Sequence, residues 1–247
     1  MTSPRSAPRT ARERVRAQLT AEIVDVARTH LATSGAAALS LRAVARELGM
    51  VSSAVYRYFP SRDDLLTTLI VEGYDALGEA AELAEAAVAR EDLLGRWHAA
   101  CTAARSWALA HPHEYALLYG SPVPGYSAPQ DTTGPAGRVA LVLAGVLRDG
   151  IASGAVTPPP GDDDATIHPG LLDELGLPEG TGLGGRLVLA WSGLFGAIGF
   201  ELFGHTHNVV VAHEEHFHAL STRLAAEVGL PARSSGAEGC RSMIIET

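Results

Sequence analysis

Residues 39–70, LSLRAVARELGMVSSAVYRYFPSRDDLLTTLI, contain the pattern that decides the fold. Two short helical segments lie on either side of a tight turn at Gly49, and Pro60 ends the second of them. The small side chain of Ala45 lets the two helices approach each other closely before the turn. We expect the apolar side chains on their inner faces to form a small core that fixes the crossing of the helices: Leu41, Val44, Ala45, Leu48, Val55 and Phe59. The pattern therefore predicts a helix-turn-helix.

Further helix signals surround this pattern. Apolar residues at helical spacing predict a helix over residues 11–33 before it. We expect Ser40 to cap the next helix, and a serine to cap the helix that begins SSAV at residue 52. Ser61 and Asp64 have the spacing of a capping box, which predicts the start of a long helix.

The rest of the chain predicts helices and shows no convincing alternating strand pattern. The expected helices span residues 92–110, 112–120, 135–153, 182–204 and 212–229. Residues 121–135 and 157–182 are rich in proline and glycine and are predicted to be loops. The sequence thus predicts an all-α protein: a disordered basic arm (1–10), a helix-turn-helix domain (11–60), a helical domain (61–230) entered through the long helix, and a disordered tail (231–247).

Charge is segregated along the chain. The formal net charge is −9, yet residues 1–62 contain ten arginines and only four acidic residues, a balance of +6. The remainder is acidic. Such a division predicts that the N-terminal end binds a polyanion, while the rest is an acidic, soluble body.

Composition and cysteine usage predict a folded cytoplasmic protein. Apolar residues make up 47% of the chain, which favours a sizeable core. The two cysteines, Cys101 and Cys240, are far apart and form no disulfide framework. The N-terminal residues lack the apolar region of a secretory signal. The apolar run at residues 187–200 is shorter than the roughly 18 to 20 residues that a spanning helix needs, so we expect a buried helix and no membrane.

A basic helix-turn-helix has the residue types that bind DNA in the major groove. The side chains expected on its outer surface suit phosphate and base contacts: Ser40, Arg42, Ser52, Ser53, Tyr56, Arg57, Tyr58 and Arg62. Tyr56 and Tyr58 have an alternative place in the core, since buried tyrosine is common. The arginines of the N-terminal arm either extend the phosphate contacts or are simply solvated charge.

Residues 39–70 resemble the DNA-binding segment of the TetR/AcrR family of regulators. The resemblance depends on the joint spacing from Gly49 through Tyr56 and Phe59 to Arg62. It implies a homodimer that binds a double-stranded, palindromic DNA operator and is most often a repressor released by a small-molecule effector. The long fourth helix would join the DNA-binding domain to a ligand-binding and dimerisation domain. A cytoplasmic regulator of this kind is nucleoid-associated when it is bound to DNA.

The resemblance also implies roles for individual residues. Ser52, Ser53 and Tyr56 would face the groove, and Arg42 would contact a base or a nearby phosphate. The phosphate contacts implied for the remaining positions are Ser40, Tyr58 and Arg62. This chain has small serines where many relatives have a long polar side chain, so we expect sparse base contacts and more weight on Arg42, Arg57, the arm and DNA shape.

The C-terminal part resembles, less specifically, a C-terminal domain found in a subset of the family. The similar segments are residues 111–126 and 190–204. Relatives often have the pattern Trp-x-x-x-His-Gly here, whereas this chain has Trp191 followed by Phe195 in place of the histidine. The two helices at 182–204 and 212–229 are apolar enough to form the interface of a homodimer; the alternative is that they pack within one monomer.

An effector pocket is expected among the helices between residues 61 and 204. Pockets are mostly apolar with a few polar groups. The candidate lining residues, each of which has an alternative place in the core, are Trp97, Cys101, Tyr115, Tyr119, Tyr126, Trp191 and Phe195.

Other chemistry finds little support in the sequence. His213 and His216 do not have the spacing of a zinc protease motif, and no cysteine pair accompanies the ten histidines. His98 and Cys101 lack a third catalytic partner. We therefore expect no metal, no cofactor and no enzymatic activity. The alternative function is a ligand- or partner-binding helical module whose degenerate helix-turn-helix has no specific operator.

Overall fold

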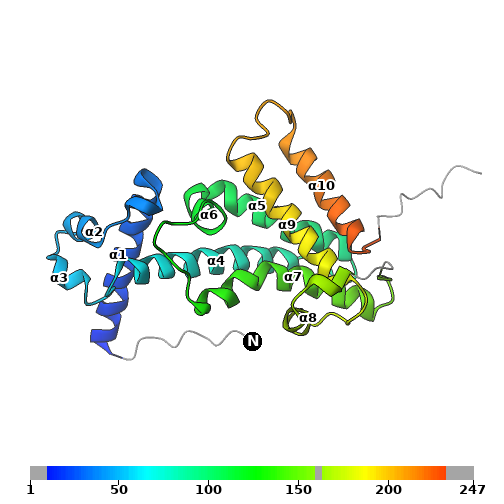
Figure 1. Ribbon diagram of the computed structural model, residues 1–247, viewed down its shortest axis with the longest axis horizontal. Helices are drawn as coiled ribbons and strands as arrows, with labels where there is room; N and C mark the ends of the chain where they lie inside the picture. The colour runs from blue at the N-terminus through cyan, green and yellow to red at the C-terminus, as the bar shows by residue number, and fades with distance from the viewer. Residues whose placement is uncertain (1–9, 159–162, 232–247) are drawn as a thin grey trace, which may run out of the picture. The chain divides into compact units, whose positions relative to one another are not determined.

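The computed structural model describes residues 10–158 and 163–231, and these form helices and loops without a strand (Figure 1). The predicted all-α class is confirmed. The α-helices are α1 (Ala11–Ser34), α2 (Leu41–Glu47), α3 (Ser52–Val55), α4 (Arg62–Ala86), α5 (Leu93–Ala110), α6 (Pro112–Tyr119), α7 (Thr133–Ala152), α8 (Pro169–Leu175), α9 (Leu183–Leu202) and α10 (His213–Glu227). Apart from Thr10 and Pro231, the predicted disordered arm and tail lie outside the described residues.

The chain divides into two compact units. Among the described residues, the first unit contains 10–76 and 110–136, and the second contains 77–109, 137–158 and 163–231. This grouping differs from the predicted division between residues 60 and 61. The reason is that α4 runs without a break from residue 62 to residue 86, and that residues 110–136 pack on the N-terminal helices.

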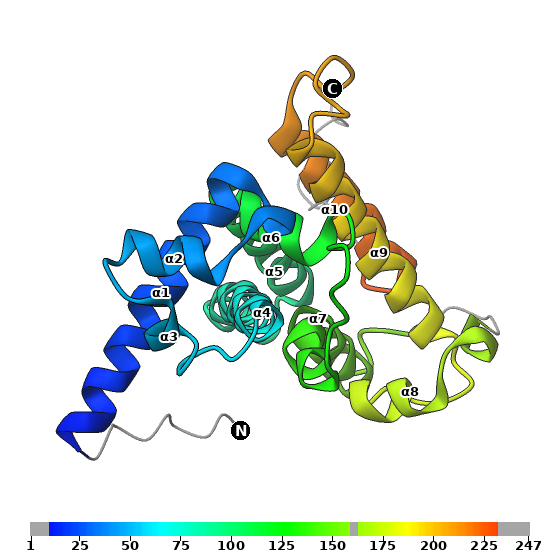
Figure 2. The same ribbon diagram turned by 60° about the vertical axis from the view of Figure 1, so that its left-hand side comes forward.

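The core of the first unit is formed by the face that α1, α2 and α3 share with the start of α4 (Figure 2). Leu41, Val44, Ala45, Val55 and Phe59 are buried there, and Leu48 is partly buried, which confirms the predicted core. Burial of each large apolar side chain contributes about 1.5 to 3 kcal/mol, so a handful of such residues is enough to hold short helices that would not form alone.

Local signals explain where these helices begin and end. Ser61 and Asp64 form the predicted capping box: the Ser61 amide donates to Asp64 Oδ2 at 2.9 Å, and the Asp64 amide donates to Ser61 Oγ at 3.1 Å. Gly49 has φ +65°, the left-handed conformation that the turn requires. Ser40 is the N-cap of α2, as predicted, although its side chain makes no capping hydrogen bond.

The predicted serine cap of α3 is wrong. The N-cap residue is Val51, whose extended backbone (φ −70°, ψ 139°) precedes the first helical residue, Ser52. After the left-handed turn at Gly49, the chain needs one more extended residue before it can enter the helix. The serine pair therefore falls inside the first turn of α3 rather than before it.

The second unit packs α5, α7, α9 and α10 around a core of fully buried side chains. Trp97 on α5 is completely buried, and its indole nitrogen donates to the Ser221 carbonyl oxygen on α10 at 3.1 Å. Gly78 on α4 has no side chain because α7 lies so close: a Cβ there would be 2.7 Å from Arg138 Cβ. A glycine inside a helix costs stability relative to alanine, and the role of Gly78 is this close approach of the two helices.

The predicted loop at 157–182 was wrong for its second half, which contains α8. Pro169 begins the helix, His168 Nδ1 accepts from the Gly170 amide at 3.2 Å, and Gly176 ends it with φ +62°. A proline at the start and a glycine just after the end are helix signals that could have revealed it. The helix has only seven residues, and the high content of Pro, Gly and Asp in the segment favoured the prediction of a loop.

The segment before α8 also positions α9. Asp164 lies in a short 3₁₀ turn (Asp163–Thr166), and its carboxylate accepts from the Gly182 amide at 2.9 Å and the Gly184 amide at 2.8 Å. The glycine-rich sequence before α9 thus binds a carboxylate of its own chain. Among the described residues, α9 is long and apolar enough, by length and composition alone, to cross a membrane.

Candidate nucleic-acid interface

A tight turn holds α2 and α3 in the helix-turn-helix. The Met50 amide donates to the Ala45 carbonyl oxygen at 2.8 Å, and the Gly49 amide donates to the Arg46 carbonyl oxygen at 3.2 Å. Ala45 itself is buried between the helices. Because the backbone of the turn is bonded and the core beneath it is apolar, the outer surface of α2 and α3 is a rigid platform.

The eight predicted DNA contacts lie on or beside this platform. The exposed ones are Arg42, Ser53, Tyr56 and Arg57. The half-buried ones are Ser40, Ser52, Tyr58 and Arg62. The structure thus places seven of these residues on α2, α3 and the residues next to them, with Arg62 following at the start of α4.

Tyr56 and Tyr58 are both more exposed than the core residue Phe59. Phe59 is buried, whereas 42% of Tyr56 is exposed, so Tyr56 is not the core aromatic of the alternative interpretation. Tyr58 is half-buried, and the Arg16 guanidinium of α1 lies 5.4 Å from the centre of its ring. This cation–π contact holds an α1 arginine beside α3.

Arg62 is occupied within the first unit. Its guanidinium donates to the carbonyl oxygens of Ala36 at 2.8 Å and Leu39 at 3.1 Å. These bonds tie the start of α4 to the segment that leads into α2. A phosphate contact by Arg62 stays a prediction, and its observed partners give it a positioning role.

Arg28 joins three helices of the first unit and was not recognised in the sequence. Its guanidinium is 2.6 Å from Glu72 on α4, 3.0 Å from Asp25 on α1 and 3.5 Å from Glu114 on α6. The pairs with Glu72 and Glu114 join residues that are far apart in the sequence, which is why no local spacing revealed them. Arg28 therefore helps to hold the helices of the first unit together and does not belong to the outer surface of the helix-turn-helix.

The segment 110–136 is attached to α4 by hydrogen bonds and aromatic rings. Tyr126 and Thr67 share a hydrogen bond of 2.9 Å between their hydroxyls, and the Tyr74 hydroxyl donates to the Leu118 carbonyl oxygen at 3.3 Å. The ring of Tyr119 lies 5.8 Å from that of Tyr74, and burial raises the pKa of both phenols. Three candidate pocket residues, Tyr115, Tyr119 and Tyr126, therefore belong to the first unit.

The other four pocket candidates belong to the second unit. Trp97 and Cys101 are completely buried in α5, and Phe195 is buried in α9 with its ring 5.7 Å from that of Trp191. The seven candidates are thus divided between two units. Their joint assignment to one effector pocket stays a prediction.

Cys101 and His98 belong to a hydrogen-bonded junction between α5 and α10. His98 bonds Ser221 Oγ through Nδ1 at 3.0 Å and Thr222 Oγ1 through Nε2 at 3.3 Å. The Thr222 hydroxyl donates to the His218 carbonyl oxygen, so its oxygen accepts from the imidazole Nε2–H. Burial raises the pKa of the Cys101 thiol to about 12, against a smaller opposing effect of its hydrogen bond to Ser221. A thiol with such a pKa is a poor nucleophile.

A shallow groove lies between α9 and α10 in the second unit. Its lining includes Phe200, Phe217 and Leu220, with His213, His216 and Thr206 as polar neighbours. None of the seven predicted pocket residues lines it. His213 Nε2 shares a hydrogen bond of 3.2 Å with the Thr206 hydroxyl, which gives one of the clustered histidines a structural role.

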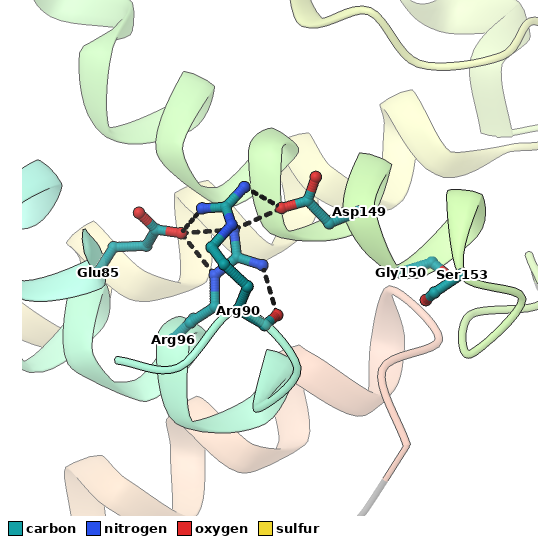
Figure 3. A network of polar contacts seen from close by, with 6 residues as sticks. All are labelled: Glu85, Arg90, Arg96, Asp149, Gly150 and Ser153. Carbon is teal, nitrogen blue, oxygen red and sulfur yellow. Dashed lines mark hydrogen bonds and ion pairs between the residues drawn. The ribbon is translucent and has the colours of Figure 1, made fainter. Parts of the chain in front are cut away.

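A buried arginine fixes the C-terminal end of α4 (Figure 3). Arg96 on α5 is 1% exposed, and its guanidinium is 2.5 Å from Glu85 on α4 and 2.7 Å from Asp149 on α7. Arg90, in the loop between α4 and α5, contacts the same two carboxylates. The bidentate pair of Arg138 and Glu82 adds a second link between α7 and α4.

Comparisons with known proteins agree with this architecture. Residues 23–69 match the family model "Bacterial regulatory proteins, tetR family", and residues 97–224 match the model "Tetracyclin repressor-like, C-terminal domain". The "HTH-type transcriptional regulator Rv1816" of Mycobacterium tuberculosis is 43% identical over 203 residues, which cover 78% of this chain and 84% of that protein. The regulator Mb1846 of Mycobacterium bovis matches to the same extent.

Solved structures give the same result. The crystal structure of the protein SCO4313 has a TM-score of 0.73 at 35% identity and covers 88% of this chain and 100% of its own. PfmR from Thermus thermophilus, a TetR family transcriptional regulator, has a TM-score of 0.54 at 18% identity over 85% of this chain and 99% of its own, and supports the fold alone. The sequence resemblance to TetR/AcrR regulators is therefore confirmed. This chain belongs to the TetR family and is a DNA-binding transcription regulator.

Proposed function

We propose that this regulator is a repressor that binds a palindromic operator as a homodimer and leaves it when a small molecule binds. The observation that carries the proposal is the platform of α2 and α3. It holds Arg42, Ser53, Tyr56 and Arg57 exposed above a closed apolar core. These side chains offer hydrogen bonds to bases and phosphates from a rigid support.

The charge division supports the same function. The basic N-terminal segment favours DNA, whereas the acidic remainder disfavours a second, sequence-blind contact with the duplex. Family membership implies a cytoplasmic regulator, and we propose that it is nucleoid-associated while it is bound to DNA. A regulator that binds and releases DNA in this way requires no catalytic group, metal or cofactor.

The helices α9 and α10 support a homodimer. They pack against each other, and α9 with the turn after it still leaves several large apolar side chains exposed: Leu189, Phe200, Phe203, Val209 and Val211. Large apolar side chains that remain exposed on a helix and its neighbouring turn are typical of an interface. A two-fold dimer would present two copies of α3 to successive major grooves about 34–36 Å apart, which is why we expect an inverted repeat.

The proposed release mechanism is a population shift that involves α4. Its C-terminal end is fixed by Glu82 and Glu85, and its N-terminal end begins at the Ser61–Asp64 capping box after α3. An effector that favours a tilt of this helix would change the separation of the two copies of α3. Because α4 is about 37 Å long, a tilt of about 5° about one end moves the other end by about 3 Å.

One selection experiment tests the function. The purified protein is incubated with fragments of its source genome at physiological salt, and the retained DNA is sequenced. We expect one or a few inverted repeats, bound by a protein that sediments as a dimer. Arg42→Ala and Tyr56→Ala should lose these sites.

The alternative is a ligand- or partner-binding module with no specific operator. The observation that favours this alternative is the pair of short serines, Ser52 and Ser53, at the start of α3. A folded protein that retains no sequence above background, and binds DNA only weakly and in a salt-sensitive manner, would favour this alternative.

A further inference from the structure

Val51 is an apolar residue that is exposed on the surface of the helix-turn-helix. It is the N-cap of α3, and 70% of its side chain is exposed. Among the described residues of α2, α3 and their turn, Tyr56 is the other exposed large apolar side chain. Tyr56 has a hydroxyl for DNA, whereas Val51 has only methyl groups.

The position of Val51 goes against local helix stability. An N-cap favours Ser, Thr, Asp or Asn, because a side-chain oxygen there accepts a backbone N–H of the first turn. Valine has no such oxygen, and α3 has no side-chain capping bond. An exposed β-branched apolar residue at this point therefore stabilises neither the helix nor the core. A residue that breaks a local rule without benefit to folding is expected to serve function.

The chemistry of the major groove supplies a partner for an apolar side chain. Base edges there present hydrogen-bond donors and acceptors, and the 5-methyl group of thymine is the apolar exception. Ser52 and Ser53, which follow Val51, are short, so the start of α3 is able to approach the base edges closely. Valine is also stiff at χ1, so its two methyl groups lose little freedom on contact.

We propose that Val51 is a specificity-determining residue that packs against the 5-methyl group of one thymine in each half-site. The proposal rests on the proposed operator binding and adds to it the base that α3 selects. Such a contact would let a recognition helix with short polar side chains distinguish A·T from G·C pairs. Removal of one such methyl contact costs about fourfold in affinity, or about fifteenfold when both half-sites lose it.

The test removes the methyl group without changing base pairing. In the operator recovered by selection, each thymine is replaced by deoxyuridine, symmetrically in both half-sites and at one position at a time. Dissociation constants are measured by fluorescence anisotropy for the wild-type protein, Val51→Ala and Val15→Ala. Val15 is the matched control, since it is an exposed valine (57%) on α1 of the same unit.

We expect one symmetric pair of positions at which deoxyuridine weakens the wild-type complex about fifteenfold. Val51→Ala should respond less than about twofold at that pair, whereas Val15→Ala should respond as the wild type does. An equal response of the wild type and Val51→Ala at every position overturns the inference and leaves operator binding intact. A folded protein that retains no sequence overturns the proposed function and this inference with it.

Val51→Ser separates the role in DNA binding from a role in folding. A serine supplies the missing capping oxygen, so the variant should unfold at a higher temperature while it loses the response to deoxyuridine. If the role of Val51 is purely structural, Val51→Ser should unfold at a lower temperature and should keep the wild-type response to deoxyuridine. Circular dichroism before each titration confirms that each variant is folded.

Discussion

Arg96 Nε donates to Glu85 Oε1 at 2.6 Å, and this contact joins α5 to the last turns of α4 with almost no exposure of the arginine to water. The guanidinium also bonds the Arg90 carbonyl oxygen at 3.1 Å and pairs with Asp149, so its donors are directed to groups from three other parts of the unit. A buried charge with this set of partners is costly to disturb, because the partners remain in place when it is removed.

Arg96→Met should lower the free energy of unfolding by about 1 to 3 kcal/mol, since Glu85 loses a buried charged hydrogen-bond donor while Arg90 still contacts both carboxylates. Arg90→Ala is the matched control. It removes an arginine from the same network that is largely exposed, and should cost less than about 1 kcal/mol. Urea unfolding followed by circular dichroism measures both. Similar losses for the two variants would contradict a special role for the buried arginine.

Arg42→Ala should weaken operator binding about tenfold or more, because a direct contact of arginine with a base or phosphate is lost. If the contact is to a phosphate, the slope of log affinity against log salt concentration should fall by about one. Anisotropy titrations over a range of salt concentrations give both quantities. The unfolding free energy should stay within about 0.5 kcal/mol of the wild type, since Arg42 is exposed.

Arg62→Ala should behave differently, although it lies beside the same surface. Its guanidinium binds the carbonyl oxygens of Ala36 and Leu39, so its loss should destabilise the first unit by about 1 to 3 kcal/mol. Operator affinity should fall with an unchanged salt slope. A reduced slope with unchanged stability would instead identify Arg62 as the predicted phosphate contact.

Cys101 should be unreactive in the folded protein. Its pKa of about 12 lies above the value of an unfolded cysteine, so the folded state holds the thiol proton more tightly. The stability that this gives is fully present below about pH 8.5 and is lost as the pH rises towards 12. In a Cys240→Ser background, labelling with a thiol reagent at pH 8 should require unfolding of the chain. Rapid labelling without denaturant would show that Cys101 is accessible.

Phe200→Arg should dissociate the proposed homodimer. Phe200 lies on α9 with 60% of its side chain exposed, and a charge there would be buried in an apolar interface. Leu83→Arg is the matched control, since Leu83 is 66% exposed on α4, outside that interface. Sedimentation velocity should give a folded monomer for Phe200→Arg and a dimer for Leu83→Arg. A dimer in both cases would place the interface elsewhere.

Several features were predictable because their causes are local. The left-handed turn at Gly49 and the capping box at Ser61 each depend on residues within a few positions of one another, and the core residues from Leu41 to Phe59 follow the helical spacing of two adjacent segments. Spacing alone identifies such features. The exposed platform of α2 and α3 follows from the same periodicity, since the residues that are not in its core must face outward.

Other features were not predictable because their causes are distant in sequence. The hydrogen bonds from the Gly182 and Gly184 amides at the start of α9 to the Asp164 carboxylate span 18 and 20 positions. The ion pair of Arg28 with Glu72 spans 44 positions, and the hydrogen bond of Tyr126 with Thr67 spans 59. No local pattern encodes a pairing across such distances.

The sequence by itself determined the all-α class, the helix-turn-helix and the family, because helical periodicity, capping and turn chemistry act between near neighbours. The tertiary structure alone decided which unit holds each aromatic residue, that Val51 rather than a serine caps α3, and that Arg62 and Arg96 bond within their own units. The physical reason is that burial and long-range hydrogen bonding depend on which surfaces meet in space. That arrangement exists only after the whole chain has packed.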